Sequence, residues 1–415
     1  MFPGDIEMLR GTAISPRPDE RQAFRAASSA GEPWERHDGN RAGNVLICSN
    51  IGNSHERAIA MKPFATYRLF FLLPLFFLPL AGAAQESSGE TGHGETTMGE
   101  FRGAKNTVHP QWFKESFLEF EEDIEEAAAE GRRLMLYFHQ DGCPYCNKLV
   151  EHNFSSEIMG QKVRQHFDVV AINMWGDREV VQVSGQQFSD KTLAAALDVD
   201  FTPTLLFFGE NRKVVLRLDG YLPPEDFGLA LEYVANRLES GSSWADYVAE
   251  RRKGAATDLD NVMEQAMAPP YDLTQGGQNR PLAVLFEEGD CMNCNLLHEK
   301  TFRDPDAGPL LDRFDILQVN RWADTSVRLP DGTSTTASRW ARDLGIGYSP
   351  AMVLFDPEGG VIMKINAQFR TFHILGALAY ASSGAYYEEP NFQRYLSDRA
   401  EEIREQGIDV DIWKY

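Results

Sequence analysis

Phe138 to Phe154 reads FHQDGCPYCNKLVEHNF, and this stretch decides the fold. An apolar run, Leu134–Phe138, ends at a short polar turn, and a polar-apolar alternation continues after the two cysteines. The pattern predicts a strand, a turn and a helix, with Cys143 at or just before the helix N-terminus. The partial positive charge of a helix N-terminus stabilises a thiolate, so we expect Cys143 to be more acidic and more nucleophilic than Cys146. Two cysteines at this spacing can close a small disulfide and reopen it by exchange.

A proline before a later apolar run supports the same fold. The sequence FTPT at Phe201–Thr204 follows a helical pattern, Lys191–Leu197, and precedes a strand-like run, Leu205–Phe208. An X-Pro bond tolerates the cis form at modest cost, so a fold can hold it there. A strand–CxxC–helix unit followed by a Thr-Pro-strand unit resembles the thioredoxin superfamily over residues 109–240. The Trp-Gly-Asp at Trp175–Asp177 is most similar to periplasmic SoxW-type thioredoxins and, more distantly, to the disulfide isomerase branch.

Specific roles follow for the residues around the first cysteine pair. We expect Cys143 to attack a client disulfide as a thiolate and Cys146 to resolve the mixed disulfide that forms. The resemblance implies a cis peptide bond before Pro203, and we expect Tyr145 to form part of the client-docking surface. The residues expected to contact the client or tune the site are Thr202, Pro203, Pro144 and Tyr145 in the first domain, and Ser349 and Pro350 in the second.

The first site departs from ordinary cytosolic thioredoxin in two ways. Gly142 stands where that family has a tryptophan, and Tyr137 stands where it has a buried carboxylate that accepts a proton from the second thiol. Proton transfer must then use water or another group, with His139, Asp141 and Glu151 as the nearby candidates. The loss of the carboxylate leaves the direction of net electron flow open.

The pattern of the first domain repeats later in the chain. Cys291 follows Cys143 by 148 residues, and Pro350 follows Pro203 by 147 residues. The segment FDILQVNRWAD, 314–324, also echoes FDVVAINMWGD at 167–177. A near-constant offset over these landmarks predicts an α/β protein of two tandem thioredoxin-like domains, each a central mixed sheet flanked by helices.

The second cysteine pair, Cys291 and Cys294, has a different setting. Glu287, Glu288 and Asp290 precede it, and like charge opposes the formation of a thiolate. The sequence leaves three interpretations open: an active redox pair, a degenerate domain used for docking, or a soft-metal site in which Met292 helps two thiolates to bind Cu(I).

Other uses of CxxC fit the sequence less well. Haem attachment needs a histidine directly after the second cysteine, but Asn147 and Asn295 stand there. A zinc ribbon needs two pairs about 15–20 residues apart, whereas 144 residues lie between Cys146 and Cys291. A mononuclear site drawing thiolates from both domains stays an alternative. We expect no metal and no cofactor other than the redox-active disulfides.

The N-terminal part predicts export. Residues 61–84 contain a basic start, a short apolar core and a small-residue cleavage site ending at Ala84, as in a Sec-type signal peptide. We expect Met61 to be the true start and residues 1–60 to be upstream sequence, the alternative being an N-terminal extension with an uncleaved anchor. Cleavage would remove Cys48 and leave only the CxxC cysteines, which suits a periplasmic or secreted redox protein.

The rest of the chain divides by composition and pattern. We expect a flexible leader at 85–108, the first domain at 109–240, a linker at 241–278, the second domain at 279–390 and a tail at 391–415. Helices are expected at Trp112–Gly131, Lys191–Leu197, Pro224–Leu238, Leu259–Ala268 and Arg394–Gln406, and strands at Leu134–Phe138, Val169–Met174, Leu205–Phe208, Val214–Leu218 and Leu282–Phe286.

Charge and motifs together define the function classes. The chain has 62 acidic against 40 basic residues, a net charge of −22, which argues against nucleic acid as a partner. The leading hypothesis is an exported thiol–disulfide oxidoreductase, a reductase or isomerase of periplasmic protein clients, or else an oxidase. A copper metallochaperone and a client-docking protein are the alternatives. The SoxW resemblance implies a membrane electron donor or acceptor.

Overall fold

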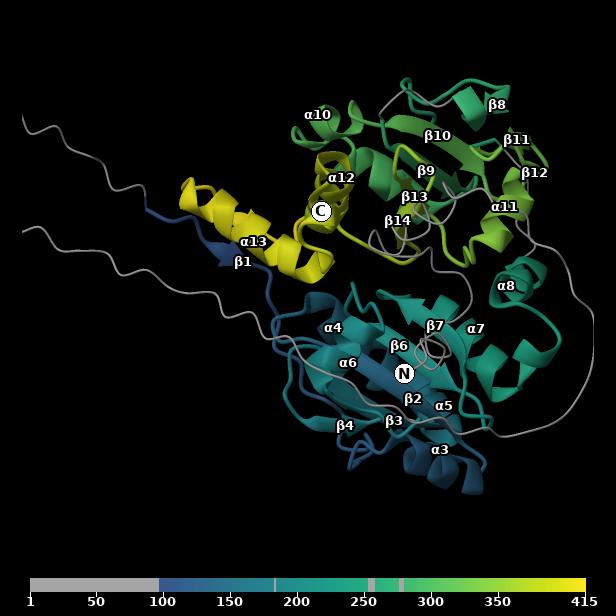
Figure 1. The fold of residues 1–415 in the computed structure, drawn as a ribbon, viewed down its shortest axis with the longest axis vertical. Helices are drawn as coiled ribbons and strands as arrows, with labels where there is room; N and C mark the ends of the chain where they lie inside the picture. Colours follow the sequence, from purple (N-terminus) through teal and green to yellow (C-terminus); the bar gives the residue numbers. More distant parts are fainter. Residues whose placement is uncertain (1–96, 183, 253–257, 276–279) are drawn as a thin grey trace, which may run out of the picture. The chain divides into compact units, whose positions relative to one another are not determined.

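The computed structural model describes residues 97–182, 184–252, 258–275 and 280–415 (Figure 1). These residues belong to one compact unit. The predicted signal peptide, the preceding 60 residues and most of the predicted leader lie outside the described residues. Among the described residues, no helix is long and apolar enough to cross a membrane.

The first domain is built on a four-stranded sheet of order β3-β2-β6-β7. The central strand β2, Arg133–His139, runs parallel to β3, Phe167–Asn173, and antiparallel to β6, Thr204–Phe208. Strand β7, Val214–Asp219, pairs antiparallel with β6 at the edge. Because β2 is covered on both faces, residues 133–138 are all buried, and its sequence is a continuous apolar run after Arg133.

Helices cover both faces of this sheet, and alternate residues of β2 face different helices. Leu134, Leu136 and Phe138 join one core cluster, whereas Met135 and Tyr137 join the other. The first cluster lies under α3, Phe120–Ala129, and α6, Asp190–Ala196. The second lies under α4, Pro144–Leu149, its π-helical continuation η1, Val150–Phe154, α5, Glu157–His166, and α7, Pro224–Ala235.

The second domain repeats this plan, which confirms the tandem prediction. Its sheet has the order β10-β9-β13-β14, formed by β10, Asp315–Asn320, β9, Leu282–Glu287, β13, Ala351–Phe355, and β14, Val361–Ile365. Strand β9 is central and pairs parallel with β10 and antiparallel with β13, as β2 does with its neighbours. The two mixed sheets therefore share both strand order and strand direction.

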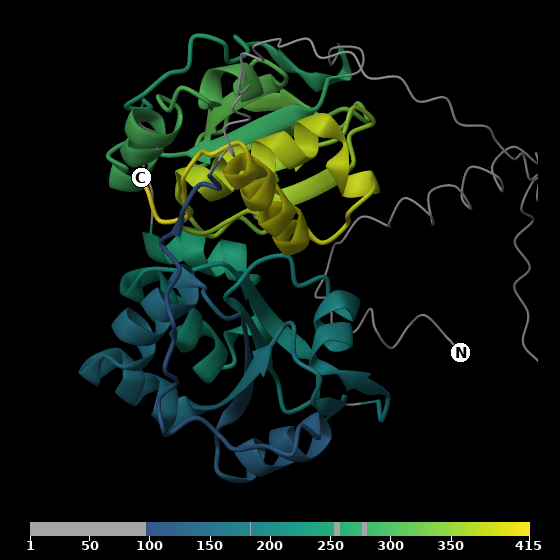
Figure 2. The same cartoon turned by 90° about the vertical axis from the view of Figure 1, so that its left-hand side faces the viewer.

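The helices of the second domain also lie on both faces of its sheet. Trp340 of α11, Ala337–Asp343, packs with Val284 and Phe286, and Leu310 of α10, Ala307–Leu311, packs with Leu285. The remaining helices are α9, Met292–Leu296, its π-helical continuation η4, Leu297–Thr301, α12, Thr371–Ser383, and α13, Phe392–Glu405. Figure 2 shows α12 and α13, in yellow, beside the second sheet.

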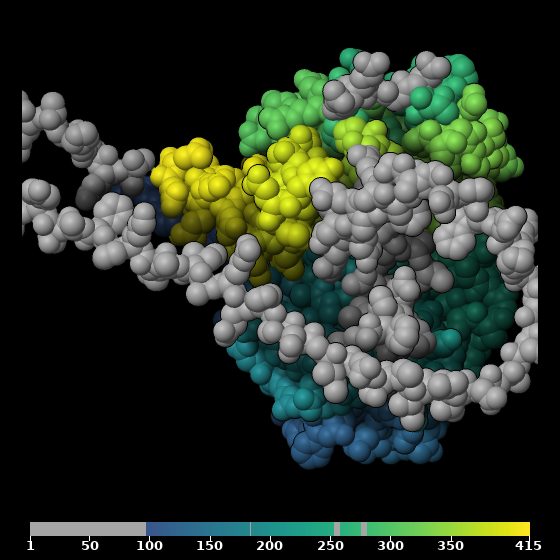
Figure 3. Space-filling model, in the orientation of Figure 1, coloured from purple at the N-terminus to yellow at the C-terminus, as the bar shows by residue number. Residues whose placement is uncertain are grey.

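Short elements complete the described chain. Strand β1, Phe101–Arg102, pairs parallel with β15, Val410–Asp411, so the N-terminal and C-terminal segments meet in one two-stranded sheet. The space-filling view of Figure 3 shows the C-terminal helices, in yellow, at the surface. The other elements are β4, Glu179–Val181, β5, Gln187–Ser189, α8, Trp244–Arg252, β8, Tyr271–Asp272, β11, Ser326–Arg328, β12, Ser334–Thr336, and the single turns η2, Leu238–Ser240, η3, Leu273–Gln275, and η5, Ala385–Tyr387.

Two helix predictions are wrong. The helix expected at Trp112–Gly131 begins only at Phe120, because Leu118 adopts a φ of 64° and the chain cannot continue as a right-handed helix through it. Phe117, which lies in the non-helical part of this segment, is 94% exposed. The segment Leu259–Ala268 is not helical either, because it runs beside β10, where the backbone N–H of Met267 bonds to the Ile316 carbonyl at 2.8 Å.

Candidate active sites

The first cysteine pair lies where the sequence predicted it. Cys143 is the residue before α4, and its sulfur accepts the backbone N–H of Cys146 at 3.0 Å. The two cysteines form a disulfide in the structure. Cys143 is 4% exposed and Cys146 is fully buried. Once reduced, the Cys143 sulfur lies at the positive end of the helix, which favours the thiolate at Cys143 over Cys146.

The predicted cis-proline stands against this pair. The Thr202–Pro203 bond is cis, which confirms the prediction. The Thr202 hydroxyl donates to the Cys143 sulfur at 3.4 Å, and the sulfur lies 3.5 Å from the Thr202 carbonyl oxygen. Residues separated by 59 positions along the chain thus meet at the sulfur that the sequence predicts to be nucleophilic.

Tyr145 does not lie on an open docking surface, which corrects the prediction made for it. It is 2% exposed, and its ring packs on Phe369, His373 and Trp413 with centroid distances of 5.5, 4.9 and 4.9 Å. Its hydroxyl accepts the backbone N–H of Arg370 at 2.8 Å and bonds to His373 Nδ1 at 3.2 Å. Burial lowers the pKa of His373 to about 3, so its ring is neutral and can accept from the tyrosine.

The three candidate proton acceptors differ in their surroundings. Burial, together with His109 and Arg178, lowers the pKa of His139 to about 3, which makes this imidazole a poor base. Glu151 is exposed on η1, whereas Asp141 lines the same cavity as Cys143. Tyr137, in place of the family carboxylate, is fully buried, and burial raises its pKa. Of the three candidates, only Asp141 lines the cavity beside Cys143.

A cavity of about 320 Å³ adjoins Cys143 and is lined by both domains. From the first domain come Gln140, Asp141, Gly142, Cys143, Pro144, Tyr145 and Thr202; from the second come Phe369, Phe372, His373, Gln393, Leu396, Ser397, Ala400, Glu401 and Arg404; Phe101 and Ile412 add the terminal segments. None of the lining residues outside the first domain was predicted from the sequence. No local pattern marks them, because each is an ordinary helix or loop residue until the domains pack.

Gln140 links the two domains at the edge of this cavity. Its amide nitrogen donates to the Thr202 hydroxyl at 3.0 Å and to Gln393 Oε1 on α13 at 2.7 Å. Its amide oxygen accepts the indole N–H of Trp175 at 2.8 Å. The Trp-Gly-Asp segment that supported the family resemblance therefore orients a residue beside the cis-proline.

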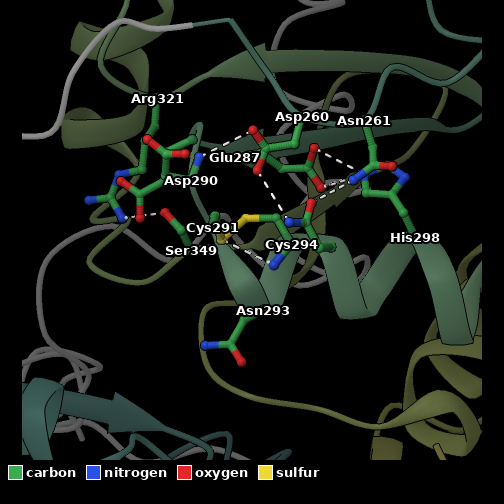
Figure 4. The surroundings of a disulfide bond; sticks show 12 residues. Asp260, Asn261, Glu287, Asp290, Cys291, Asn293, Cys294, His298, Arg321 and Ser349 are labelled. Atoms are coloured by element: carbon green, nitrogen blue, oxygen red, sulfur yellow. Dashed lines mark hydrogen bonds and ion pairs between the residues drawn. A yellow bond between two sulfur atoms is a disulfide. The ribbon is translucent and has the colours of Figure 1, made fainter.

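The second cysteine pair repeats the geometry of the first. Cys291 precedes α9 and accepts the backbone N–H of Cys294 at 3.0 Å, and the two form a disulfide (Figure 4). The Ser349–Pro350 bond is cis, like its counterpart in the first domain. Met292 is 76% exposed, whereas its counterpart in the first domain, Pro144, is buried. The residue after the first cysteine is therefore exposed to solvent in the second site and buried in the first.

Two of the acidic residues expected to crowd Cys291 are hydrogen-bonded within the second domain. Glu287 is 1% exposed, and its carboxylate bonds to His298 Nε2 at 2.9 Å and to Gln318 Nε2 at 2.6 Å. Glu288 accepts a hydrogen bond from the indole N–H of Trp322. Two of the three carboxylates are therefore hydrogen-bonded to side chains that the sequence pattern did not reveal.

A buried cation in the second site was also missed. Arg321 is 3% exposed and donates to the Ser349 hydroxyl at 3.2 Å and to the Ile346 carbonyl at 2.9 Å. Figure 4 shows Arg321 and Ser349 on the same side of the disulfide. Burial lowers the pKa of Arg321 to about 10, so the guanidinium is charged at neutral pH. The sequence repeat indicates this difference between the sites, because Arg321 in the second domain stands at the position equivalent to Met174 in the first.

Two disulfide-bonded CxxC pairs, each beside a cis-proline on a thioredoxin-like sheet, define a thiol–disulfide oxidoreductase. A family model described as a thioredoxin-like domain matches residues 120–235 and 273–381, and the chain belongs to this family. A search of curated proteins found no match. Among the described residues, no group of three or more histidine, cysteine or acidic side chains could hold a metal ion.

Three of the solved structures that are similar to parts of this chain are the following. A thioredoxin from Thermus thermophilus is 25% identical, with 31% of this chain and 88% of that chain covered and a TM-score of 0.24. A thioredoxin-fold protein from Helicobacter pylori is 14% identical, covering 35% and 91% with a TM-score of 0.26. A protein disulfide oxidoreductase from Aeropyrum pernix is 13% identical, covering 66% and 97% with a TM-score of 0.21.

Proposed function

We propose that this protein is an exported oxidoreductase that reduces or isomerises disulfides of periplasmic protein clients. One observation carries the proposal: Cys143 lies before a helix, in contact with Thr202 and beside a cis-proline, with Cys146 buried behind it. This arrangement presents one sulfur for attack and keeps the other in reserve. The predicted signal peptide supports export, and the SoxW resemblance supports the client class.

The exchange proceeds in two balanced steps. The Cys143 thiolate attacks one sulfur of a client disulfide, which forms a Cys143–client disulfide and releases the other client sulfur as a thiolate. The Cys146 thiolate then attacks the Cys143 sulfur, closes the Cys143–Cys146 disulfide and releases the second client sulfur. The client gains two electrons, its thiolates take up protons from solvent, and the cysteine pair is oxidised.

A further dithiol must reduce the pair again for a second turnover. We propose a membrane electron donor carrying such a dithiol, which is the donor class that the SoxW resemblance implies. The net charge of −22 supports protein rather than nucleic-acid partners. For an oxidase, the same steps run in reverse and the partner is an electron acceptor.

We propose that the second pair is redox-active as well. The buried Arg321 beside Ser349 favours a thiolate at Cys291, and Met292, the residue after Cys291, is exposed.

Reduction potentials of the two pairs test the proposal. Each pair is measured in the full chain with Cys48→Ser and the other pair replaced by serine, in glutathione or dithiothreitol buffers. A first-site value near that of thioredoxin, about −270 mV, supports a reductase, and one near about −120 mV identifies an oxidant. The absence of a reversible couple at Cys143–Cys146 would overturn the proposed function.

A further inference from the structure

Gln140 precedes the first cysteine pair, and hydrogen bonds hold both ends of its side-chain amide. Its oxygen accepts the indole N–H of Trp175 at 2.8 Å. Its nitrogen donates to Gln393 Oε1 at 2.7 Å and to the Thr202 hydroxyl at 3.0 Å. Because an amide nitrogen has two hydrogens to donate, both donors of Gln140 are in use.

The outer partners of this amide fix the direction of its bonds. The indole nitrogen of Trp175 can only donate, so the atom of Gln140 that faces it must be the oxygen. At the other end, the Gln393 nitrogen donates to the Asp200 carbonyl at 3.0 Å, and a carbonyl can only accept. Gln393 therefore turns its oxygen towards Gln140, and neither amide can flip without the loss of two hydrogen bonds.

The direction of these bonds decides what the Thr202 hydroxyl can do. Its oxygen accepts an N–H from Gln140, so its single hydrogen is left to donate to another atom. The Cys143 sulfur, 3.4 Å from that oxygen, accepts this hydrogen. A hydrogen bond donated to sulfur stabilises the thiolate more than the thiol, because the charged form is the stronger acceptor.

The second domain repeats this arrangement with different residues. Glu288 stands at the position of Gln140, and it accepts the indole N–H of Trp322 as Gln140 accepts that of its own tryptophan. A carboxylate has no N–H to give to the hydroxyl before the cis-proline. Arg321 supplies one instead, because it donates to the Ser349 hydroxyl at 3.2 Å. In both domains a side-chain N–H is therefore bonded to that hydroxyl oxygen.

We propose that Gln140 is a positioning residue of the first site: it directs the Thr202 hydroxyl hydrogen to the Cys143 sulfur and so raises the thiolate fraction of Cys143. The inference rests on the proposed function and adds to it a residue that acts on the sulfur through another side chain. Because Gln393 belongs to α13, the second domain also helps to hold the donor in place.

The charged and titratable side chains near the sulfur are the same in every variant used below. Desolvation raises the pKa of Asp200, in the cis-proline segment, to about 7, so this carboxyl titrates within the range of the measurement. The others line the cavity beside Cys143 and are Asp141, Tyr145, His373, Glu401 and Arg404. Since no variant changes them, they contribute equally to all the titrations compared.

The test uses the full chain with its other cysteines replaced by serine, so that Cys143 is its only cysteine. The rate of alkylation by iodoacetamide is measured between about pH 4 and pH 10, because only the thiolate reacts. Gln140→Leu removes the N–H donated to Thr202 and should raise the pH midpoint of alkylation by about one unit. Gln161→Leu, at an exposed residue of α5, is the control and should leave the midpoint unchanged.

A double substitution tests whether Gln140 acts through Thr202. Thr202→Val keeps the shape of the side chain but removes the hydroxyl, so it should raise the midpoint at least as much as Gln140→Leu does. Once the hydroxyl is gone, Gln140→Leu should add no further shift. A merely structural role of Gln140 would instead give the same shift in both backgrounds.

A second variant keeps the test open if Gln140→Leu does not fold, which circular dichroism would show. Trp175→Phe combined with Gln393→Leu removes both outer partners of Gln140 and leaves its amide free to turn. The midpoint should rise in this variant too, by less than in Gln140→Leu, because the amide still points its nitrogen to Thr202 part of the time.

The outcomes separate this inference from the proposed function. An unchanged midpoint in either folded variant, or a full shift by Gln140→Leu in the Thr202→Val background, would overturn the role of Gln140. The proposed function has its own readout, the reversible couple of a chain that keeps both Cys143 and Cys146. A couple without the midpoint shifts removes only the role of Gln140, whereas a missing couple overturns the proposed function whatever the midpoints are.

Discussion

The hydroxyl of Tyr145, a residue between the two cysteines of the first site, accepts the backbone N–H of Arg370 from the second domain at 2.8 Å. From the sequence, this residue was expected to form part of the client-docking surface. Here it anchors one domain to the other, so the first site depends on the second domain for its shape.

Removing the Tyr145 hydroxyl should weaken this anchor. Tyr145→Phe leaves the Arg370 N–H and His373 Nδ1 without their partner, and an unsatisfied buried group costs about 1–3 kcal/mol. Denaturant unfolding would measure the loss. Tyr387→Phe, at a residue that is 55% exposed, is the control. Equal stabilities of the two variants would show that the Tyr145 contact contributes nothing.

Gly220 should be required for domain packing as well as for its backbone conformation. It has a φ of 97°, and a Cβ there would lie 2.7 Å from the Ala367 Cβ. Gly185 has a φ of 74° and open space around it, so Gly185→Ala adds only backbone strain. We expect Gly220→Ala to lower the free energy of unfolding by about 1–3 kcal/mol more than Gly185→Ala does, because the added methyl group overpacks the contact with Ala367. Thermal unfolding of both variants measures the difference, and a smaller loss at Gly220 would contradict the packing.

His373 should make stability depend on pH. Its folded pKa of about 3 lies below the ordinary 6.5, so the unfolded chain binds a proton that the folded chain does not. The stabilisation is fully present above pH 6.5 and is lost as the pH falls from there, at up to about 1.4 kcal/mol per pH unit. His373→Asn keeps a hydrogen-bonding side chain but does not titrate.

Unfolding midpoints between pH 7.5 and 5 test this expectation. The decline should be steeper for the unmodified protein than for His373→Asn. The histidines His109 and His139 also have lowered pKa values, so a residual slope is expected in the variant. Identical slopes in the two proteins would show that His373 is protonated in the folded state.

Arg321 should control the reactivity of the second pair. Arg321→Met introduces the residue found at the equivalent position of the first domain, and it removes the cation that bonds to Ser349. The thiolate fraction of Cys291 should fall, and alkylation at pH 7 should slow by about tenfold. The measurement uses a chain in which Cys291 is the only cysteine.

Arg328→Met provides the charge-matched control for this prediction. Its side chain is 56% exposed on β11 and pairs with Asp272 rather than with the disulfide surroundings. Alkylation should proceed at the original rate in this variant. Equal slowing by both substitutions would assign the effect to net charge instead of to the position of Arg321.

Much of the fold could be predicted from the sequence because its signals are local. The apolar run of β2, the cysteine spacing and the Thr-Pro before β6 each lie within a few residues, and the repeat shows the same signals twice. The helix predicted at Trp112–Gly131 is wrong in its first part because Leu118 adopts a left-handed backbone conformation. Apolar periodicity does not reveal such a conformation.

The sequence by itself determined the two thioredoxin-like domains, the cysteine pairs and the prolines beside them. Only the tertiary structure decided what surrounds them: Tyr145 and Arg370 are 225 residues apart, and Gln140 and Gln393 are 253 apart. Such contacts depend on how two separately folded surfaces meet, and neither surface carries a periodic pattern that identifies its partner. The cavity beside Cys143 is a product of that packing.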